Sequence, residues 1–383
     1  MATTQSLSSD PQHHLSEEAS YKNKTLPART GVAHMLEKWL GVPLNIIEAI
    51  GSYVIVRPMN WALRHLDGLS YKLEGTRLKR VLQHILFPVI MIAGMFIGFA
   101  ATEAGASLQS ITTLALIPVV IGLIVAPLER LLPYSRNWLE GGNDTSVDLM
   151  MFISGAFWNG FFAKYLIQVL FLVSVVEAME AYGHGLWPVQ LPALVQVFLF
   201  ILIKDFFRYW LHRALHEVPF LWRFHAAHHS VKRLYWLNGI RSHPVEVVGQ
   251  ALLFAIPYAL LQPPAEVIMV AILMQLTIGI FQHANIDLEL GFWEYIFSIG
   301  DNHRYHHYPN KEVGDSNYGG EFILFDILFG TFHKVKGERP HDRIGIGTAP
   351  NYPMTMAGLY IAPFLPDQKV FGDSNDQDIP DKP

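Results

Sequence analysis

The 383-residue chain contains no cysteine. This absence excludes disulfide bonds, thiolate metal ligands and cysteine nucleophiles, so any bound metal ion must be held by nitrogen or oxygen atoms. Charge is also scarce: Asp, Glu, Lys and Arg make up 16% of the chain, against about 25% in a typical soluble protein. The formal net charge is only -5 and no long basic run is present, which argues against nucleic acid as a partner.

Apolar residues make up 51% of the chain, and many of them gather in six stretches that carry almost no charge. These stretches are residues 81–102, 104–128, 149–176, 181–203, 247–265 and 267–286. The first four reach the roughly 20 residues that a helix needs to cross a bilayer core. The last two are separated by the turn sequence Gln262-Pro263-Pro264, so they form either two short spans or one helical hairpin. We therefore predict an all-α, polytopic membrane bundle with four full spans.

Lysine and arginine residues indicate the orientation of this bundle. The segment before the first span is rich in both, the connections after the first and third spans have neither, and the connection after the second has two. Because cytoplasmic connections carry the positive residues, the start of the first span and residues 204–241 are predicted to be cytoplasmic. His184 then lies on the opposite side of the membrane and drops out as a metal ligand.

Composition divides the chain into five segments. Residues 1–33 are polar, lack an apolar stretch of signal-peptide type and are predicted to be disordered, while residues 34–80 are predicted to form interfacial helices. Residues 81–203 make up the membrane bundle, residues 204–345 a cytoplasmic histidine-rich helical cap, and residues 346–383 a polar C-terminal tail. The chemistry is expected in the cap, because its histidines are clustered.

Three histidine clusters lie in the cap. They read HRALH at residues 212–216, HAAHH at residues 225–229 and HRYHH at residues 303–307. Side chains three and four residues apart share one face of a helix, so each cluster can point its imidazoles at one place. Adjacent imidazoles repel one another when protonated and lose hydration when neutral unless something binds them. A single pair of this kind is more often a surface or capping pair, but three clusters on one side of the membrane favour metal ligands.

The number of histidines implies two metal ions. Imidazole suits Zn, Cu, Fe and Ni, and eight histidines are too many for one ion, which takes about four to six ligands. The zinc-protease motif HExxH is absent, because Val218, Pro219 and Phe220 follow His216-Glu217. The ExxH pairs of soluble di-iron bundles are absent as well.

The order HxxxH, HxxHH and HxxHH, separated by hydrophobic segments, resembles the fatty acid hydroxylase superfamily and in particular its sterol desaturase branch. The likeness extends over residues 204–333 and includes RSHP, FQHANI, DSNYGG and FDILFGTFH, although the branch often has Trp at the position of Phe325. It implies an integral membrane di-iron enzyme whose hydroxylase or desaturase catalytic region is residues 204–345, with no catalytic residue beyond the metal ligands. The implied ligands are His212, His216, His225, His228, His229, His303, His306 and His307. Two additional ligands are expected, His243 in RSHP and His283 in FQHANI.

Ligating imidazoles need their other ring nitrogen fixed by a carboxylate, an amide or a carbonyl. The expected partners are Asp205, Asn302 and Asn317. Asp205 comes first, because it lies seven residues before His212 on the same helical face, and an ionisable group in a hydrophobic segment is usually functional. Further acidic candidates are Glu217, Glu246, Asp301 and Asp315. No ligand role is assigned to His34, His65, His84, His333 and His341.

The resemblance implies O2-dependent hydroxylation or desaturation of an unactivated C–H bond in a membrane lipid, with two iron ions as cofactor and O2 as co-substrate. Zinc can replace iron in a preparation. No haem-binding or flavin-binding stretch and no GxGxxG motif is visible, so a separate electron donor of ferredoxin, rubredoxin or cytochrome b5 type is expected. Sterol, isoprenoid, fatty acyl, ceramide, carotenoid and alkylglycerol substrates are not distinguished, and neither are hydroxylation and desaturation.

Two other functions compete with this interpretation. A membrane metal transporter or metal-binding protein would hold its ligands near the bilayer midplane, whereas these clusters lie at helix ends. A zinc-dependent hydrolase needs a general base, usually a carboxylate, and the all-histidine pattern argues against it. The lack of cysteine, of an ER-retrieval signal and of a fused electron-transfer domain favours a bacterial inner membrane.

Overall fold

A computed structural model describes residues 52, 57–105, 111–141, 144–161, 186–347, 349 and 352–371. All of them belong to one of the two structural units of the chain, Leu44–Pro383. Several predictions fall outside the described residues: those for residues 1–33, for most of residues 34–56, for His184 and for the end of the tail.

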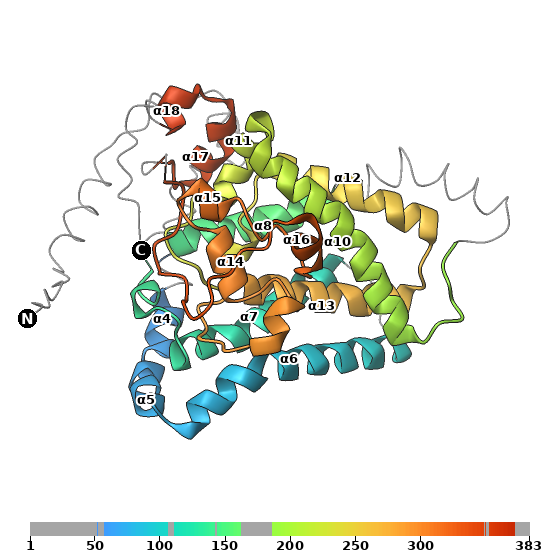
Figure 1. Ribbon diagram of the computed structural model, residues 1–383, viewed down its shortest axis with the longest axis horizontal. Coiled ribbons are helices and arrows are strands. Elements are labelled where there is room, and N and C mark those ends of the chain that lie inside the picture. The colour runs from blue at the N-terminus through green and yellow to red at the C-terminus, as the bar shows by residue number, and fades with distance from the viewer. Residues whose placement is uncertain are drawn as a thin grey trace, which may run out of the picture. The chain divides into compact units, whose positions relative to one another are not determined.

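Helices are the only extended regular elements in the described part of the chain, which confirms the all-α prediction (Figure 1). The longer α-helices are α6 (Arg77–Glu103), α7 (Ile111–Leu131), α8 (Asp144–Phe161), α10 (Ala193–Glu217), α11 (Pro219–His229), α12 (Pro244–Leu261) and α13 (Ala265–His283). The shorter ones are α4 (Arg57–Leu63), α5 (His65–Leu73), α14 (Asp301–His306), α15 (Lys311–Gly314), α16 (Leu324–Phe329), α17 (Met356–Ile361) and α18 (Asp367–Phe371). The 3-10 helices are η2 (Arg136–Trp138), η4 (Trp236–Ile240), η5 (Gly291–Tyr295) and η6 (Ala362–Phe364). Figure 1 shows the long helices α6, α10, α12 and α13 extending to the right of the short helices α14, α15 and α17.

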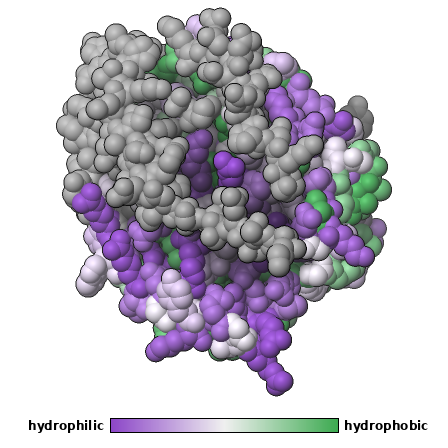
Figure 2. All heavy atoms as spheres, turned by 60° about the vertical axis from the view of Figure 1, so that its left-hand side comes forward, coloured by the Kyte–Doolittle hydropathy of each residue, from purple (hydrophilic) through white to green (hydrophobic). Residues whose placement is uncertain are grey.

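Two helices of the described chain, α6 and α13, are long and apolar enough to cross a membrane. Helix α6 coincides with the first predicted span, residues 81–102. Helix α13 corresponds to the stretch 267–286, which was expected to be too short for a full span. Helix α6 exposes an apolar stripe at helical spacing, which is typical of a surface that faces lipid. The stripe consists of Val81, Ile85, Val89, Ile92 and Phe96. The face of the molecule in Figure 2 is mainly hydrophilic where it is coloured, and hydrophobic residues gather at its right-hand edge.

Helices α6 and α13 pack against each other in opposite directions. Gly94 of α6 lies beside Thr277, and Gly98, one turn further on, lies beside Val270. A Cβ atom at Gly98 would lie only 2.8 Å from the side chain of Leu273, so glycine is needed for this close approach. The pair forms a GxxxG motif, which lets membrane helices approach closely. Consequently α13 ends beside the start of α6, and this places His283 at the same end of the bundle as the other histidine clusters.

The junction between α10 and α11 brings two histidine clusters together. Helix α10 ends at Glu217, and Val218 adopts an extended conformation (φ -95°, ψ 113°). The cause is Pro219, which disfavours a helical conformation of the preceding residue and is itself well suited to the first position of the next helix. The chain therefore turns sharply within one residue, and the ring of His216 in α10 meets that of His229 in α11 with 4.6 Å between their centroids.

A buried ion pair ties helix α8 to the segment that follows α11. Nε of Arg241 donates to Oδ1 of Asp148 at 2.5 Å, and both side chains are completely buried. The hydroxyl of Tyr235 donates to the other carboxylate oxygen at 2.6 Å. The backbone carbonyl of Arg241 in turn accepts from Nδ1 of His228 at 3.1 Å, so this ion pair supports one of the clustered histidines.

We expect Asp148→Ala to lower the free energy of unfolding by about 3–5 kcal/mol, because it leaves the guanidinium of Arg241 buried without a counter-charge. The measurement is chemical denaturation of the purified protein in detergent. Glu140→Ala is the matched control, since Glu140 forms an exposed ion pair with Arg64 at 3.6 Å, and exposed pairs contribute little. Equal losses for the two variants would contradict a supporting role for the buried pair.

Candidate metal centre

Nine histidines converge in two groups, each with ligand atoms that all lie within 4.8 Å of one another. The first cluster consists of His212, His216, His225, His229 and His306. The second cluster consists of His228, His283, His303 and His307. None of the nine is more than 9% exposed, which excludes a solvated surface patch. All eight histidines of the three sequence motifs are among them, together with His283.

Helical spacing distributes these histidines between the two clusters. In α11, His225 and His229 are four residues apart and enter the first cluster, while His228 lies on another side of the helix and enters the second. The same division recurs around α14, where His306 enters the first cluster and His303 and His307 enter the second. Each HxxHH motif therefore contributes to both clusters, whereas HRALH contributes only to the first.

Backbone carbonyls determine which ring nitrogens of the first cluster carry hydrogen. Nδ1 of His212 lies 2.8 Å from the carbonyl oxygen of Tyr318, and Nδ1 of His306 lies 2.7 Å from that of Ser316. A carbonyl oxygen can only accept, so Nδ1 must be the protonated nitrogen in both rings. In the neutral ring, Nε2 then presents an unprotonated lone pair, as a metal ligand requires.

Carboxylates fix two more rings of the first cluster in the same way. Nδ1 of His216 lies 2.9 Å from Asp315, and Nδ1 of His225 lies 3.1 Å from Glu246. Carboxylate partners hold the ring orientation and make the other nitrogen a better ligand. Asp315 and Glu246 were only secondary candidates from the sequence, and they are the acidic residues that contact the ligand rings.

The Nε2 atoms of the first cluster face one another at close range. They are 3.1 Å apart between His212 and His225, 3.1 Å between His216 and His229, and 3.2 Å between His225 and His229. Because Nδ1 of His212 and of His225 holds the hydrogen, the first of these pairs sets lone pair against lone pair. A cation between the nitrogens turns this repulsion into coordination, so the arrangement fits a metal ion.

Two rings of the second cluster show the same pattern. Nδ1 of His228 lies 3.1 Å from the carbonyl of Arg241, and Nδ1 of His283 lies 2.9 Å from Oδ1 of Asn238. Nε2 of His283 is buried without a hydrogen-bond partner among the described residues, and buried polar atoms of this kind normally have one. Nε2 of His303 and Nε2 of His307 are 3.1 Å apart. This group therefore fits a second metal ion.

Burial lowers the pKa of most of the clustered histidines, which favours their neutral form. It lowers the pKa of six of them well below the usual value for histidine, and the neighbouring imidazoles act in the same direction. These six are His212, His216, His228, His229, His303 and His307. The pKa of His306 is lowered to about 3, again mainly by burial. Neutral imidazoles are the form that binds metal, and nitrogen-only ligands suit Zn, Cu, Fe and Ni.

The two clusters adjoin each other. The rings of His229 and His307, which belong to different clusters, stack with 4.4 Å between their centroids. The rings of His225 and His228 are 5.3 Å apart. Two bound metal ions would therefore be neighbours, and one substrate atom could lie close to both.

His243 was expected as a ligand, but it lies outside both clusters. Its Nδ1 accepts from the backbone N–H of Val245, and its Nε2 faces the carbonyl of Tyr360 at 3.2 Å. Its ring packs against Phe224 and Phe364. Both nitrogens are already engaged, so we remove His243 from the proposed ligand set. Among the other described histidines, none of His65, His84, His333 and His341 belongs to either cluster.

The three residues expected to contact the ligand rings form hydrogen bonds with backbone groups instead. These bonds involve the loop of residues 315–322 and the segments next to it. Asp205 accepts hydrogen bonds from the backbone N–H groups of Gly320, Glu321 and Phe322. The amide of Asn317 bonds to the backbone of Asn302 and His333, and Asn302 itself donates to the backbone of Glu294 and Phe297. These contacts position the loop that carries Asp315 and the carbonyls of Ser316 and Tyr318. Glu217 and Asp301 pair with arginines instead.

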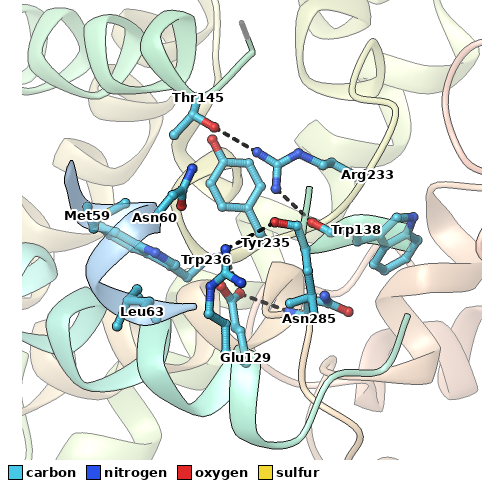
Figure 3. A pocket seen from close by; sticks show the side chains of 13 residues that line it. Met59, Asn60, Leu63, Glu129, Trp138, Thr145, Arg233, Tyr235, Trp236 and Asn285 are labelled. Carbon is cyan, nitrogen blue, oxygen red and sulfur yellow. Dashed lines mark hydrogen bonds between the residues drawn. The ribbon is translucent and has the colours of Figure 1, made fainter. Parts of the chain in front are cut away.

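Two cavities of the described structure differ in their relation to the histidines, because one reaches the clusters and the other does not. A cavity of about 340 Å³ is lined by His212 and His225 of the first cluster and by His228, His283 and His303 of the second. The other, of about 40 Å³, lies where α4, α7 and η4 meet (Figure 3). There the carboxylate of Glu129 accepts from the backbone N–H groups of Trp236 and Asn285 (Figure 3), which is a structural role.

We expect His306→Ala to lower the metal content from two ions per chain towards one, because it removes a ligand from the first cluster only. His243→Ala should retain both ions, since the ring of His243 is engaged by Val245 and Tyr360. Elemental analysis of the purified variants measures this difference. A loss of metal in His243→Ala equal to that in His306→Ala would restore His243 as a ligand.

Asp315→Ala is expected to weaken metal binding about 10–100-fold, because it frees the ring of His216 from its carboxylate partner. Competition with a chelator gives the affinity. Glu217→Ala is the matched control, since Glu217 lies in the same region but pairs with Arg213 at 2.7 Å. The idea fails if the two variants bind metal equally well.

Comparison with known proteins agrees with this geometry. The sequence profile of the fatty acid hydroxylase family matches residues 197–331, which include every clustered histidine. The chain is 32% identical to the ornithine lipid hydroxylase OlsE of Rhizobium tropici over 269 residues, which cover 68% of this chain and 78% of that protein. It is 34% identical to human alkylglycerol monooxygenase over 128 residues, 33% of this chain and 28% of the relative. It is 26% identical to the C-4 methylsterol oxidase of Schizosaccharomyces pombe over 155 residues, 38% and 50% of the two chains.

No solved structure matches the chain. The likeness to the bacterial hydroxylase nevertheless covers most of both proteins, and the family match coincides with the region that forms the two histidine clusters. The resemblance drawn from the histidine motifs is thereby confirmed, and with it the assignment of the chain as an oxidoreductase. The chain belongs to the fatty acid hydroxylase family.

Proposed function

We propose that this protein is a membrane-bound di-iron oxygenase that uses O2 to hydroxylate or desaturate a C–H position of a membrane lipid. The observation that carries the proposal is the pair of adjoining, buried, all-histidine clusters that open onto one cavity. The names of the relatives support the lipid part, because they refer to ornithine lipid, alkylglycerol and methylsterol.

The donor set supports iron in both positions. Imidazole binds iron readily, and the two clusters offer five and four imidazole rings. When bound, two iron ions would supply the activation of O2 and the cleavage of a strong C–H bond. His212, His216, His225, His229 and His306 would hold one ion, and His228, His283, His303 and His307 the other.

The protein itself contributes orientation and the exclusion of water. Asp315 and Glu246 hold the rings of His216 and His225, so the ligands do not have to reorganise during the reaction. Loop 315–322 and the buried Arg241 hold further rings in place. The cavity admits a substrate beside His212 and His283, and its burial keeps bulk water away from the reacting carbon.

The location follows from the same proposal. The two clusters would lie on the cytoplasmic side of a bacterial inner membrane, at the ends of helices such as α10 and α13. There a separate ferredoxin, rubredoxin or cytochrome b5 type protein could deliver electrons. A lipid could reach the cavity sideways between helices without leaving the bilayer, which explains why a site at the membrane surface is built on a membrane bundle.

We expect the iron-loaded protein in detergent to convert a component of a bacterial lipid extract when a ferredoxin, its reductase and O2 are present. Mass spectrometry should show a lipid that has gained one oxygen atom or lost two hydrogen atoms. His306→Ala should abolish the conversion, and His341→Ala, whose ring stacks on Tyr308 away from both clusters, should retain it. Equal activity with zinc in place of iron would show hydrolysis instead and contradict the proposal.

A further inference from the structure

The cavity beside the clusters is lined by residues of several helices, most of them on α10, α12 and α13, and it combines polar and apolar side chains. Its polar lining includes Glu246 at the start of α12. Its apolar lining includes Leu211, Phe254, Ile272 and Leu276. A lipid could therefore place both a hydrocarbon portion and a polar portion in this cavity, beside the histidines.

One side of the cavity carries two cations that share one carboxylate. Nη1 of Arg208 lies 3.2 Å and Nζ of Lys204 lies 3.7 Å from Oε1 of Glu321. All three side chains line the cavity, and those of Lys204 and Glu321 are 16% and 1% exposed. Removing charges from water is costly, so a cluster of charges at a cavity wall is a candidate for ligand binding.

The position of Arg208 depends on a glycine. A Cβ atom at Gly320 would lie 2.3 Å from Cδ of Arg208, so only glycine leaves room for the arginine at the cavity wall. An arginine has five N–H donors and a lysine has three, and the single contact oxygen of Glu321 uses few of them. The remaining donors suit an anionic group of a ligand, which a guanidinium binds through two parallel hydrogen bonds.

Two further polar atoms of the cavity lining have no partner within the described structure. They are Oε2 of Glu246 and Nε2 of Gln275. Glu246 is only 5% exposed. A buried carboxylate oxygen without a donor is destabilising, and a hydrocarbon ligand would leave it in that state. A ligand with its own hydrogen-bond donors, such as an ammonium group, would satisfy it.

We propose that this cavity is a headgroup site for a zwitterionic lipid, with Arg208 and Lys204 binding an anionic group and the free oxygen of Glu246 accepting from a cationic donor. The inference rests on the proposed function and deepens it, because it names the part of the lipid that is held at the iron site. Since Glu246 also contacts the ligand His225, the headgroup comes close to the first cluster. The oxidised carbon is therefore in or beside the headgroup and not in the middle of an acyl chain.

Binding of small lipids to the zinc-loaded, full-length protein in detergent tests this inference without turnover. The probes are N-palmitoyl-lysine, which is zwitterionic, its methyl ester, which lacks the anionic group, and N-acetyl-lysine, which lacks the hydrocarbon chain. Thermophoresis gives the dissociation constants. We expect N-palmitoyl-lysine to bind at least about tenfold more tightly than either of the other two probes. A factor of this size corresponds to the loss of one charge-assisted hydrogen bond.

Arg208→Leu should abolish the preference for the free acid over its methyl ester. Arg213→Leu is the matched control on the same helix, because Arg213 pairs with Glu217 outside the cavity, and it should keep the preference. Lys204→Met provides a second test in case the first variant does not fold, and it should reduce the preference too. All variants are first compared for zinc content, so that a damaged metal centre is recognised.

The inference is overturned if the wild-type protein binds N-palmitoyl-lysine and its methyl ester equally. It is also overturned if Arg208→Leu and Lys204→Met prefer the free acid as strongly as the control variant Arg213→Leu does. Equal binding of N-acetyl-lysine and N-palmitoyl-lysine would overturn the lipid part, since a soluble compound would then suffice. Normal probe binding without lipid oxidation by the iron-loaded protein would contradict the proposed function and still support the headgroup site. Lipid oxidation by the iron-loaded protein without any probe preference would support the proposed function and contradict the headgroup site.

Discussion

Unprotonated imidazole nitrogens that face one another inside a protein repel, and this chain holds several histidines in that arrangement. In the first cluster, His212 and His225 each give their Nδ1 hydrogen to an oxygen and turn Nε2 towards the other ring at 3.1 Å. A cation between the rings would turn this repulsion into coordination. The surrounding fold therefore has to hold the rings in position before a metal ion binds. Its polar contacts to the rings do this.

The loop of residues 315–322 shows how this ordering is achieved. It presents Asp315 to His216, and its carbonyls of Ser316 and Tyr318 to two further rings. Backbone N–H groups of the same loop bind the buried carboxylates of Asp205 and Asp326. A loop held from both sides in this way can orient ligands as rigidly as a helix does. The geometry of the histidine clusters thus depends on hydrogen bonds to backbone atoms as much as on the histidines.

Much of the site was predictable from spacing alone. Three and four-residue intervals decide that the HRALH, HAAHH and HRYHH histidines share helix faces, and all of them lie in the clusters. His283 was singled out for a less direct reason, the likeness around FQHAN, and it lies in the second cluster. His243 lies outside both clusters, and a histidine beside a proline has no periodic neighbours to indicate its direction. Asp205 was placed next to a ligand because it shares the helix face of His212, yet it binds the backbone of Gly320 instead.

The sequence by itself determined that the protein is helical, rich in membrane-compatible segments and supplied with histidines that share helix faces. These properties follow from composition and from helical periodicity, which are local. The relation to lipid oxidoreductases came from the likeness of its histidine motifs to those of a known family. Only the tertiary structure decided how nine rings divide into two clusters, which acids touch them, and that Lys204, Arg208 and Glu321 meet at one cavity. Those features join residues about a hundred positions apart, and many are hydrogen bonds to backbone carbonyls, which every residue possesses and no sequence pattern distinguishes.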